Sequence, residues 1–557
     1  MNLNERTLTV MRWLAAMPLL DRLELAAVSG TPDRTTYDAV DTLERKGLAS
    51  SISHATDLLR TTRRYCLTAA GLRRLAELEG VGLDGILRVY PVSTQWRRIL
   101  MERLDAVGVI YRLASSIAAE TGSVSLRWYR ASPLDAAVEL ADGRTLGIVR
   151  QGLTTDRTGF SKRLWRLREG PLPGAVLMLM PDEVRLRHAR RLLDGSPVPA
   201  VLALERDAAW LGAEKPAWRL PSAAATRDLR YVLASYLEQG GQPMVESEPM
   251  LATLPEDIVS GRPGRPTPHW LLPALLKPAE KRVLDLLFDW PGIAPDDLRG
   301  LLCLSRGRLY ETVASLFDAG LIERIAMEGR RLSLSDQGLA LLARRDRTSV
   351  GAARKRWSAS PIDAKSPLEW RNVSGRRSRQ LLRNLDHTAA VHGFIATLAK
   401  QARSLGWELS QIDPPFRASR HFAHGPLPAR AGGTRSVHPD AFGLLRREST
   451  TWPFFLEWER RAVRPSTMAA RLAPYLRYYS SHRPTDDHGA QPAVLVVFGD
   501  DIAATNFLRV ARKETTRARV EMPLLVSHEG LLAREGPLGR AWRTSDGWEA
   551  VRPLPNG

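Results

Sequence analysis

The stretch Phe454-Phe455-Leu456-Glu457-Trp458-Glu459 places two carboxylates at the end of a strongly apolar segment. Alternate residues of a strand share a face, so we expect Glu457 and Glu459 on one side of a sheet and Trp458 on the other. Asp440, which follows Pro439, begins the preceding strand or hairpin. Three carboxylates from adjacent β-strands would form an oxygen site suited to Mg²⁺ or Mn²⁺. Such a metal can activate water for cleavage of a phosphodiester strand.

A related segment occurs earlier in the chain without these acids. Pro133-Leu-Asp is followed by Leu146-Gly-Ile-Val-Arg-Gln151, so Val149 and Gln151 stand where the later segment has two glutamates. After each segment come an arginine-rich stretch, an apolar strand, an aspartate and a further helix. The agreement in order and spacing predicts an internal duplication with a degenerate first copy.

Two further regions repeat a helix-and-wing plan. Residues 5–80 predict helices over 20–28, 33–46 and 68–78, with wing strands at 48–52 and 64–67. Residues 277–345 predict helices over 279–288, 296–302 and 305–319, then strands at 321–325 and 331–334 and a last helix. Both regions therefore resemble winged helices.

These observations predict a multidomain chain that combines winged helices with α/β domains built on mixed sheets. The expected boundaries are 1–85 for winged helix 1, 92–222 for the degenerate α/β domain, 223–276 for a linker, 277–346 for winged helix 2, 347–383 for a basic linker and 384–557 for the second α/β domain.

The charge balance favours a polyanionic partner. Of 557 residues, 80 are Lys or Arg and 61 are Asp or Glu, for a formal net charge of +19. Double-stranded DNA is the leading partner, although an arginine-rich genome would also raise the charge. The two cysteines predict a reduced protein without disulfides, and no stretch reaches the ~18 apolar residues of a membrane span. We expect a cytoplasmic protein with no membrane partner.

Arginine and small polar residues on the third helix and wing of each winged helix are the candidate DNA contacts. The alternative is that these modules dock other proteins. The candidates are Arg34, Thr35, Thr36, Arg63 and Arg64 in the first module, and Ser305, Arg306, Arg308, Arg330 and Arg331 in the second.

The acidic pattern resembles the PD-(D/E)XK nuclease fold, and the C-terminal half is similar to the replication-relaxation family, which includes MobC-type relaxases of plasmids. The segments that carry the resemblance are His438-Pro-Asp-Ala-Phe, Phe454-Phe-Leu-Glu-Trp-Glu-Arg and Arg471-Leu-Ala-Pro-Tyr-Leu-Arg-Tyr-Tyr479. The resemblance implies that Asp440, Glu457 and Glu459 are metal ligands and catalytic residues. Glu459 stands in place of the motif lysine, and Arg460 or Arg471 could substitute for it from another direction.

Other chemistry-bearing residues have less specific patterns. His387 is a further ligand candidate, although both His387 and His392 are more typical of core or surface histidines. Tyr475, Tyr478 and Tyr479 could supply a phenolic nucleophile, although their helical spacing is more typical of packing against a sheet.

The sequence thus predicts a plasmid or mobile-element protein that binds duplex DNA and nicks or processes it with a divalent metal. A second copy of the chain, or relaxosome or replication proteins, are further candidate partners. The alternative is a non-catalytic transcription or replication-initiation factor with an inactive nuclease-like domain.

Overall fold

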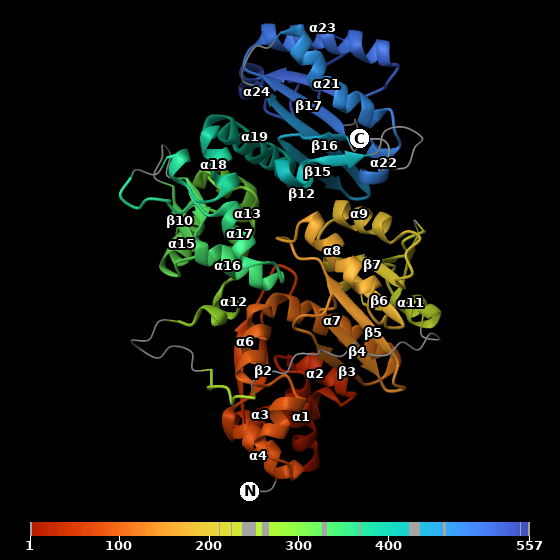
Figure 1. The fold of residues 1–557 in the computed structure, drawn as a ribbon, viewed down its shortest axis with the longest axis vertical. Coiled ribbons are helices and arrows are strands. Elements are labelled where there is room, and N and C mark those ends of the chain that lie inside the picture. Colours follow the sequence, from red (N-terminus) through yellow and green to blue (C-terminus); the bar gives the residue numbers. More distant parts are fainter. Residues whose placement is uncertain are drawn as a thin grey trace. The chain divides into compact units, whose positions relative to one another are not determined.

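The computed structural model describes residues 3–554 except 211, 224, 237–251, 259–266, 326–330, 367–368, 423–434, 460–463, 546 and 548. The chain forms two compact units. Unit 1 comprises Met1–Lys281 with Ala340–Ala353, and unit 2 comprises Arg282–Leu339 with Arg354–Gly557. Figure 1 shows that each unit combines a helical region with a sheet.

Unit 1 begins with a helical region that carries a two-stranded antiparallel hairpin. Its second helix starts in a capping box, in which Asp21 and Glu24 each bind the other's backbone N–H, and ends at Gly30 in the left-handed conformation. The elements are α1 (Glu5–Ala16), α2 (Arg22–Ser29), α3 (Asp33–Arg45), β1 (Ala49–His54), β2 (Thr62–Leu67), α4 (Ala69–Glu79), α5 (Leu83–Val89) and α6 (Thr94–Glu102).

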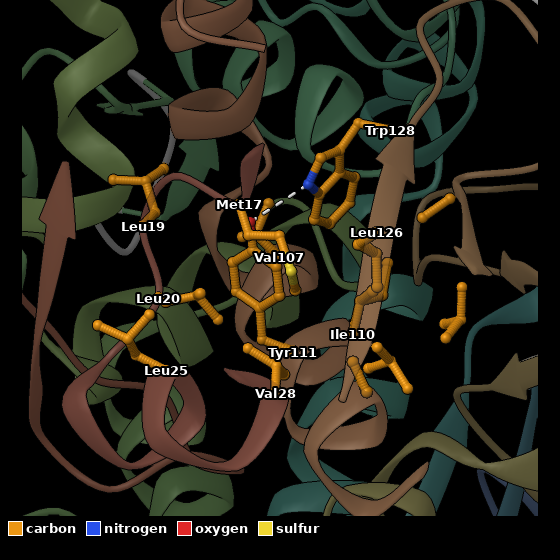
Figure 2. Close-up of a cluster of buried hydrophobic side chains, with 14 of the residues drawn as sticks. Met17, Leu19, Leu20, Leu25, Val28, Val107, Ile110, Tyr111, Leu126 and Trp128 are labelled. Atoms are coloured by element: carbon orange, nitrogen blue, oxygen red, sulfur yellow. Dashed lines mark hydrogen bonds between the residues drawn. The ribbon is translucent and has the colours of Figure 1, made fainter. Parts of the chain in front are cut away.

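A seven-stranded mixed sheet forms the rest of unit 1. Figure 2 shows helix α7 packed with the first strand in a shared core, where the Trp128 indole N–H donates to the Tyr111 hydroxyl at 3.2 Å. The elements are α7 (Leu104–Thr121), β3 (Val124–Trp128), β4 (Ala136–Leu140), β5 (Thr145–Arg150), α8 (Arg157–Arg168), β6 (Ala175–Met180), α9 (Glu183–Leu193), β7 (Ala200–Leu204), α10 (Glu205–Trp210), β8 (Trp218–Arg219), β9 (Thr226–Arg227), α11 (Leu229–Tyr236), η1 (His269–Leu271) and α12 (Leu272–Leu275).

The second helical region carries another antiparallel hairpin, β10 with β11. It is followed by two short α-helices and a 3₁₀ turn, all of which lie inside the predicted basic linker. The elements are α13 (Pro278–Asp289), α14 (Pro295–Leu302), α15 (Arg306–Asp318), β10 (Ile322–Arg324), β11 (Leu332–Leu334), α16 (Asp336–Arg345), α17 (Val350–Trp357), η2 (Trp370–Asn372) and α18 (Arg376–Arg383).

A six-stranded mixed sheet completes unit 2. The Phe394 and Trp458 rings contact edge to face, so α19 covers the face of the sheet opposite Glu457. The elements are α19 (Leu385–Ser404), β12 (Glu408–Asp413), α20 (Pro415–Ala418), β13 (Arg420–Phe422), β14 (Arg435–Val437), β15 (Ala441–Arg447), β16 (Thr450–Glu459), α21 (Pro465–Tyr479), α22 (Arg483–His488), β17 (Ala493–Phe498), α23 (Asp501–Ala518), β18 (Leu524–His528), α24 (Glu529–Glu535) and β19 (Arg543–Thr544).

The two sheets share one strand plan. In unit 1, β3 to β8 pair as antiparallel, antiparallel, parallel, parallel and antiparallel neighbours. In unit 2, β12, β15, β16, β17, β18 and β19 pair in the same sequence of directions. Both sheets are therefore the mixed α/β type expected from the sequence.

The registers of the two sheets correspond residue by residue. Ile148 pairs with Ala136 on β4, and Leu456 pairs with Ala441 on β15. These pairings place Val149 at the position of Glu457, because each residue follows the paired apolar residue directly. By the same count, Gln151 occupies the position of Glu459 in unit 2.

The two helical regions also share a local feature at a glycine. The hydroxyl of Thr68 accepts from the Gly71 N–H and donates to a glycine carbonyl, and Ser335 does the same with Gly338. A Cβ at Gly71 or Gly338 would lie 2.0 or 2.2 Å from a backbone oxygen. Only glycine allows the helix to start this close to the strand.

Part of the predicted 223–276 linker packs on unit 1. Leu254 and Ile258 lie against its hydrophobic core, and the Thr94 N–H donates to the Thr253 carbonyl at 2.9 Å. Apolar side chains hold this part of the segment against the core. Among the described residues, no helix combines the length and apolar character needed to cross a bilayer.

Candidate functional site

A large open cavity in unit 2 collects the predicted acidic residues. Its volume is about 1350 Å³, and it lies where β16 and β17 end and β15 begins. Asp440, Glu457, Glu459 and Arg471 all line it. The structure therefore brings the four predicted catalytic residues to one cavity.

Asp440 is fixed by the sheet and by a histidine. Its N–H donates to the Leu456 carbonyl at 2.8 Å, and its Oδ2 accepts from the Trp458 N–H at 2.8 Å. Its Oδ1 lies 3.0 Å from Nε2 of His387, in the first turn of α19. His387 thus holds the second oxygen of the carboxylate in place.

Glu457 lies on the cavity wall beside Asp440 and is hydrogen-bonded by the Tyr475 hydroxyl. Burial, then the charge of Asp440, raises the pKa of Glu457 to about 8. The Asp440 carboxylate accepts from the N–H of the residue that follows Glu457, so the two acidic residues are neighbours at the cavity. Tyr475 is buried, as its helical spacing predicts for a packing residue rather than a nucleophile. Its contact with Glu457 was not predicted from the sequence.

Glu459 points to the same side of β16 but forms an ion pair with Arg471 on α21. Within the described residues, no three His, Cys, Asp or Glu side chains are placed to hold one metal ion together. Metal binding by the three predicted acids stays a prediction. The donor set fits a smaller arrangement, because Mg²⁺ commonly uses one or two carboxylates and completes its shell with water and phosphate oxygens.

The cavity is also lined by two residues that were not predicted as site residues, His438 and Arg383. The ring nitrogens of His438 lie 3.0 Å from the Ser419 hydroxyl and 2.6 Å from the Ser436 hydroxyl. Arg383, the last residue of α18, is exposed at the cavity. It belongs to the predicted basic linker over 347–383, and Arg376 and Arg379 are also exposed there.

One comparison with known proteins gives a match. Residues 307–494 match the replication-relaxation family model. The match runs from α15 to the start of β17 and contains all four predicted catalytic residues, so it supports the family expected from the sequence. No curated protein and no solved structure matches the chain.

Unit 1 has a counterpart of Asp440. The Asp135 N–H donates to the Ile148 carbonyl at 2.8 Å, and its Oδ2 accepts from the Arg150 N–H at 2.6 Å. Arg163 and Arg347 bind the same carboxylate at 2.6 and 2.8 Å. Burial opposes the charge of Asp135, but the two arginines outweigh it and hold its pKa well below the usual range.

The chain itself fills the space around Asp135, leaving a cavity of about 10 Å³. Asp346 pairs with Arg150 at 3.0 Å and accepts from the Thr154 N–H at 2.9 Å. Arg347 donates to the carbonyls of Arg130, Ser132 and Leu134. Residues 346–347 therefore close the site, and we call them the plug.

Two of the predicted DNA contacts are wrong, because the structure buries them. Arg64 is 1% exposed and pairs with Glu24 at 2.8 Å, so it stabilises the interior of the first helical region. Thr36 is 0% exposed because it faces inward on α3.

The remaining predicted contacts have various environments. Arg34, Arg63, Ser305, Arg306 and Arg308 are exposed, and Thr35 is half-buried. Ser305 also caps α15. Arg331 is half-buried and donates to the Gly292 carbonyl at 3.1 Å. Arg330 lies outside the described residues.

Proposed function

We propose that the chain is a DNA-binding protein of a plasmid or mobile element whose C-terminal α/β region nicks or otherwise processes DNA with a divalent metal. One observation carries the proposal: Asp440 and Glu457 line one large open cavity, and the Asp440 carboxylate accepts from the N–H of Trp458, the residue next to Glu457. The family match, which spans this cavity's acids, supports a role in replication or relaxation.

Asp440 and Glu457 would hold Mg²⁺ or Mn²⁺. The ion, when bound, would supply an activated water and positive charge for the phosphate. His387 would orient Asp440 through its 3.0 Å contact, and Tyr475 would position Glu457 through its hydroxyl. These two residues are positioning residues, because each acts through a carboxylate.

Arg471 and Arg383 would bind the phosphodiester backbone, since arginine matches phosphate geometry. Arg471 lies beside Glu459, which occupies the place of the motif lysine. Its guanidinium also lowers the pKa of Glu457, although less than burial and Asp440 raise it. Arg471 would thus supply the positive charge that the lysine would otherwise give.

We further propose that the two helical regions are winged helices that bind duplex DNA, with α3 and α15 as recognition helices. Arg34 on α3 and Arg306 and Arg308 on α15 are exposed, as this role requires. The net charge of +19 favours the same partner.

The shared strand plan, the matching registers and the matching glycines support an internal duplication. In the first copy Val149 and Gln151 replace the acids, and the plug fills the space around Asp135. We therefore assign this copy a structural role rather than a catalytic one.

The test is conversion of a supercoiled plasmid that carries the native locus to open circle, with Mg²⁺, Mn²⁺ or EDTA. Wild type should nick in either metal and not in EDTA, whereas Glu457→Gln should bind the plasmid without nicking it. Val149→Ala, at the equivalent position of unit 1, is the matched control and should nick like wild type. Metal-independent nicking, or full nicking by Glu457→Gln, would exclude the proposed site.

The ion pair between Glu459 and Arg471 favours a second candidate. A non-catalytic transcription or replication-initiation factor would tolerate a neutralised acid at the lysine position. This reading predicts tight duplex binding and unchanged plasmid topology under every metal condition.

A further inference from the structure

A second, smaller cavity of about 180 Å³ adjoins the acidic cavity in unit 2. Asp440 and His387 line both cavities. The remaining wall comes from the helical region, from α19 and from α20, with Trp290, Trp357 and Phe416 as its Trp and Phe residues. A ligand in this cavity would therefore lie next to the proposed catalytic carboxylate.

The aromatic walls are held in place by their neighbours. The Trp290 ring packs edge to face on His392, with ring centres 5.4 Å apart. The Trp357 ring lies 5.1 Å from that of Phe416 and also contacts Phe288. Packed aromatic rings give a preformed cavity, which reduces the entropic cost of binding a flat ligand.

Several polar atoms of cavity-lining residues are buried and have no hydrogen-bond partner in the described part of the chain. They include Nε1 of Trp290, Nε1 of Trp357 and Nδ1 of His392. Their residues are only 2%, 5% and 3% exposed. Unpaired buried polar atoms are costly and indicate a missing partner.

The size and chemistry of the cavity select among ligands. A cavity needs only ~10–15 Å³ to hold one water, so a volume of about 180 Å³ is far more than a single ion fills. An aliphatic side chain would leave both indole N–H groups unpaired. A flat heterocycle with ring and carbonyl acceptors would pair them and pack against the aromatic walls.

We propose that this cavity binds one unstacked nucleobase of a DNA strand whose neighbouring phosphate lies at Asp440. The inference rests on the proposed function and specifies its substrate as DNA with an unpaired base. Arg377 also lines the small cavity and Arg383 the large one, so positive charge is available for the backbone on both sides. Removing a base from the stack is easiest where the base is already unpaired.

The test is equilibrium binding of fluorescent DNA to the full-length protein in EDTA, so that cleavage plays no part. Three duplexes of one sequence are compared: fully paired, with one bulged base, and with a bulged abasic site. Wild type should bind the bulged base about tenfold more tightly than the abasic bulge. Equal affinity for the two bulges would overturn the inference.

Trp290→Phe and Trp357→Phe each keep a six-membered aromatic ring and remove the five-membered part of the indole with its N–H. Each should reduce the preference for the base about fivefold, the value of one hydrogen bond, and leave the affinity for paired duplex unchanged. Trp165→Phe, at an exposed position in unit 1, is the matched control and should keep the preference. An undiminished preference in both cavity variants would also overturn the inference.

The same assay separates this inference from the proposed function. Binding of all three duplexes without a base preference would remove only the nucleobase site. Failure to bind any of the three would count against DNA as the partner and so against both proposals. An aromatic peptide that displaces DNA from the wild-type protein, but does not bind the Trp290→Phe variant, would instead indicate a protein ligand.

Discussion

Asp135 and Asp440 accept the same backbone hydrogen bond in their two sheets, from the N–H of Arg150 and of Trp458. Their carboxylates then meet opposite surroundings. Asp135 is paired with arginines in a space of about 10 Å³, and Asp440 faces a cavity of about 1350 Å³. The equivalent aspartate therefore stabilises the fold in the first sheet, whereas in the second sheet it faces an open cavity.

Removal of the plug arginine should destabilise unit 1. Arg347 adopts a left-handed φ of 55°, which is unfavourable for a side chain and is offset here by its hydrogen bonds to Asp135 and three carbonyls. We expect Arg347→Ala to lower the free energy of unfolding by about 3 kcal/mol, because it leaves buried partners unpaired.

Thermal unfolding and hydrogen exchange at residues 130–155 would measure that change. Arg344→Ala, one turn earlier on the chain and more exposed, is the control and should change stability little. Equal effects of the two substitutions would show that the plug contributes nothing specific.

Tyr475→Phe should lower the nicking rate by no more than about tenfold, because the loss of a contact that only orients a ligand costs ~10–100-fold in activity and this contact should lie at the lower end. The Tyr475 hydroxyl donates to Glu457, and burial, followed by Glu457 itself, raises its pKa well above the usual value. A phenol in that state is not a phenolate nucleophile at neutral pH. The readout is open-circle product together with a denaturing gel for protein–DNA adducts, and a covalent adduct that disappears in the variant would refute this assignment.

Glu323→Gln should stabilise unit 2 in a pH-dependent manner. Burial, then the charge of Asp336, raises the pKa of Glu323 from 4.5 to about 7. The folded state therefore binds this proton more tightly, so wild type loses stability as pH rises from about 5 to about 7, whereas the variant does not.

The advantage of the variant should be near zero at about pH 4.5 and reach about 2 kcal/mol above about pH 7.5. Thermal melts across that range measure it. An advantage that is constant with pH would mean that Glu323 does not titrate in this range.

The double substitution Arg306→Ala and Arg308→Ala should weaken duplex binding and lower the salt slope of log K by about 2, the number of phosphate charges removed. Anisotropy titrations at several salt concentrations give the slope. Arg534→Ala, an exposed arginine on α24, is the control. An unchanged slope in the double variant would exclude α15 as a phosphate-binding surface.

Much of this fold follows from the sequence because its signals are local. The apolar run ending in Glu457-Trp458-Glu459 does form a strand, with Trp458 packed on α19 and the glutamates on the other face. The helices and hairpins of both helical regions lie within a few residues of their predicted bounds. Periodicity and glycine caps determine such elements.

The features that the sequence could not predict depend on long-range packing. Arg64 resembles an exposed wing arginine, but Glu24 draws it into the interior. The plug pairs Asp346 and Arg347 with residues about two hundred positions away, and no local pattern marks that contact. Arg163 follows Gln151 by the same number of residues as Arg471 follows Glu459. This spacing could have predicted that Arg471 contacts the acidic residues.

The most direct test of the account compares Asp440→Asn with Asp135→Asn in the plasmid-nicking assay, with stability measured on the same samples. We predict that Asp440→Asn lowers nicking at least ~100-fold while melting and DNA binding stay at wild-type levels. Asp135→Asn should lower the melting temperature of unit 1 and leave nicking per folded molecule unchanged. Full nicking by Asp440→Asn, or loss of nicking only in Asp135→Asn, would contradict the assignment of the catalytic role to the second sheet.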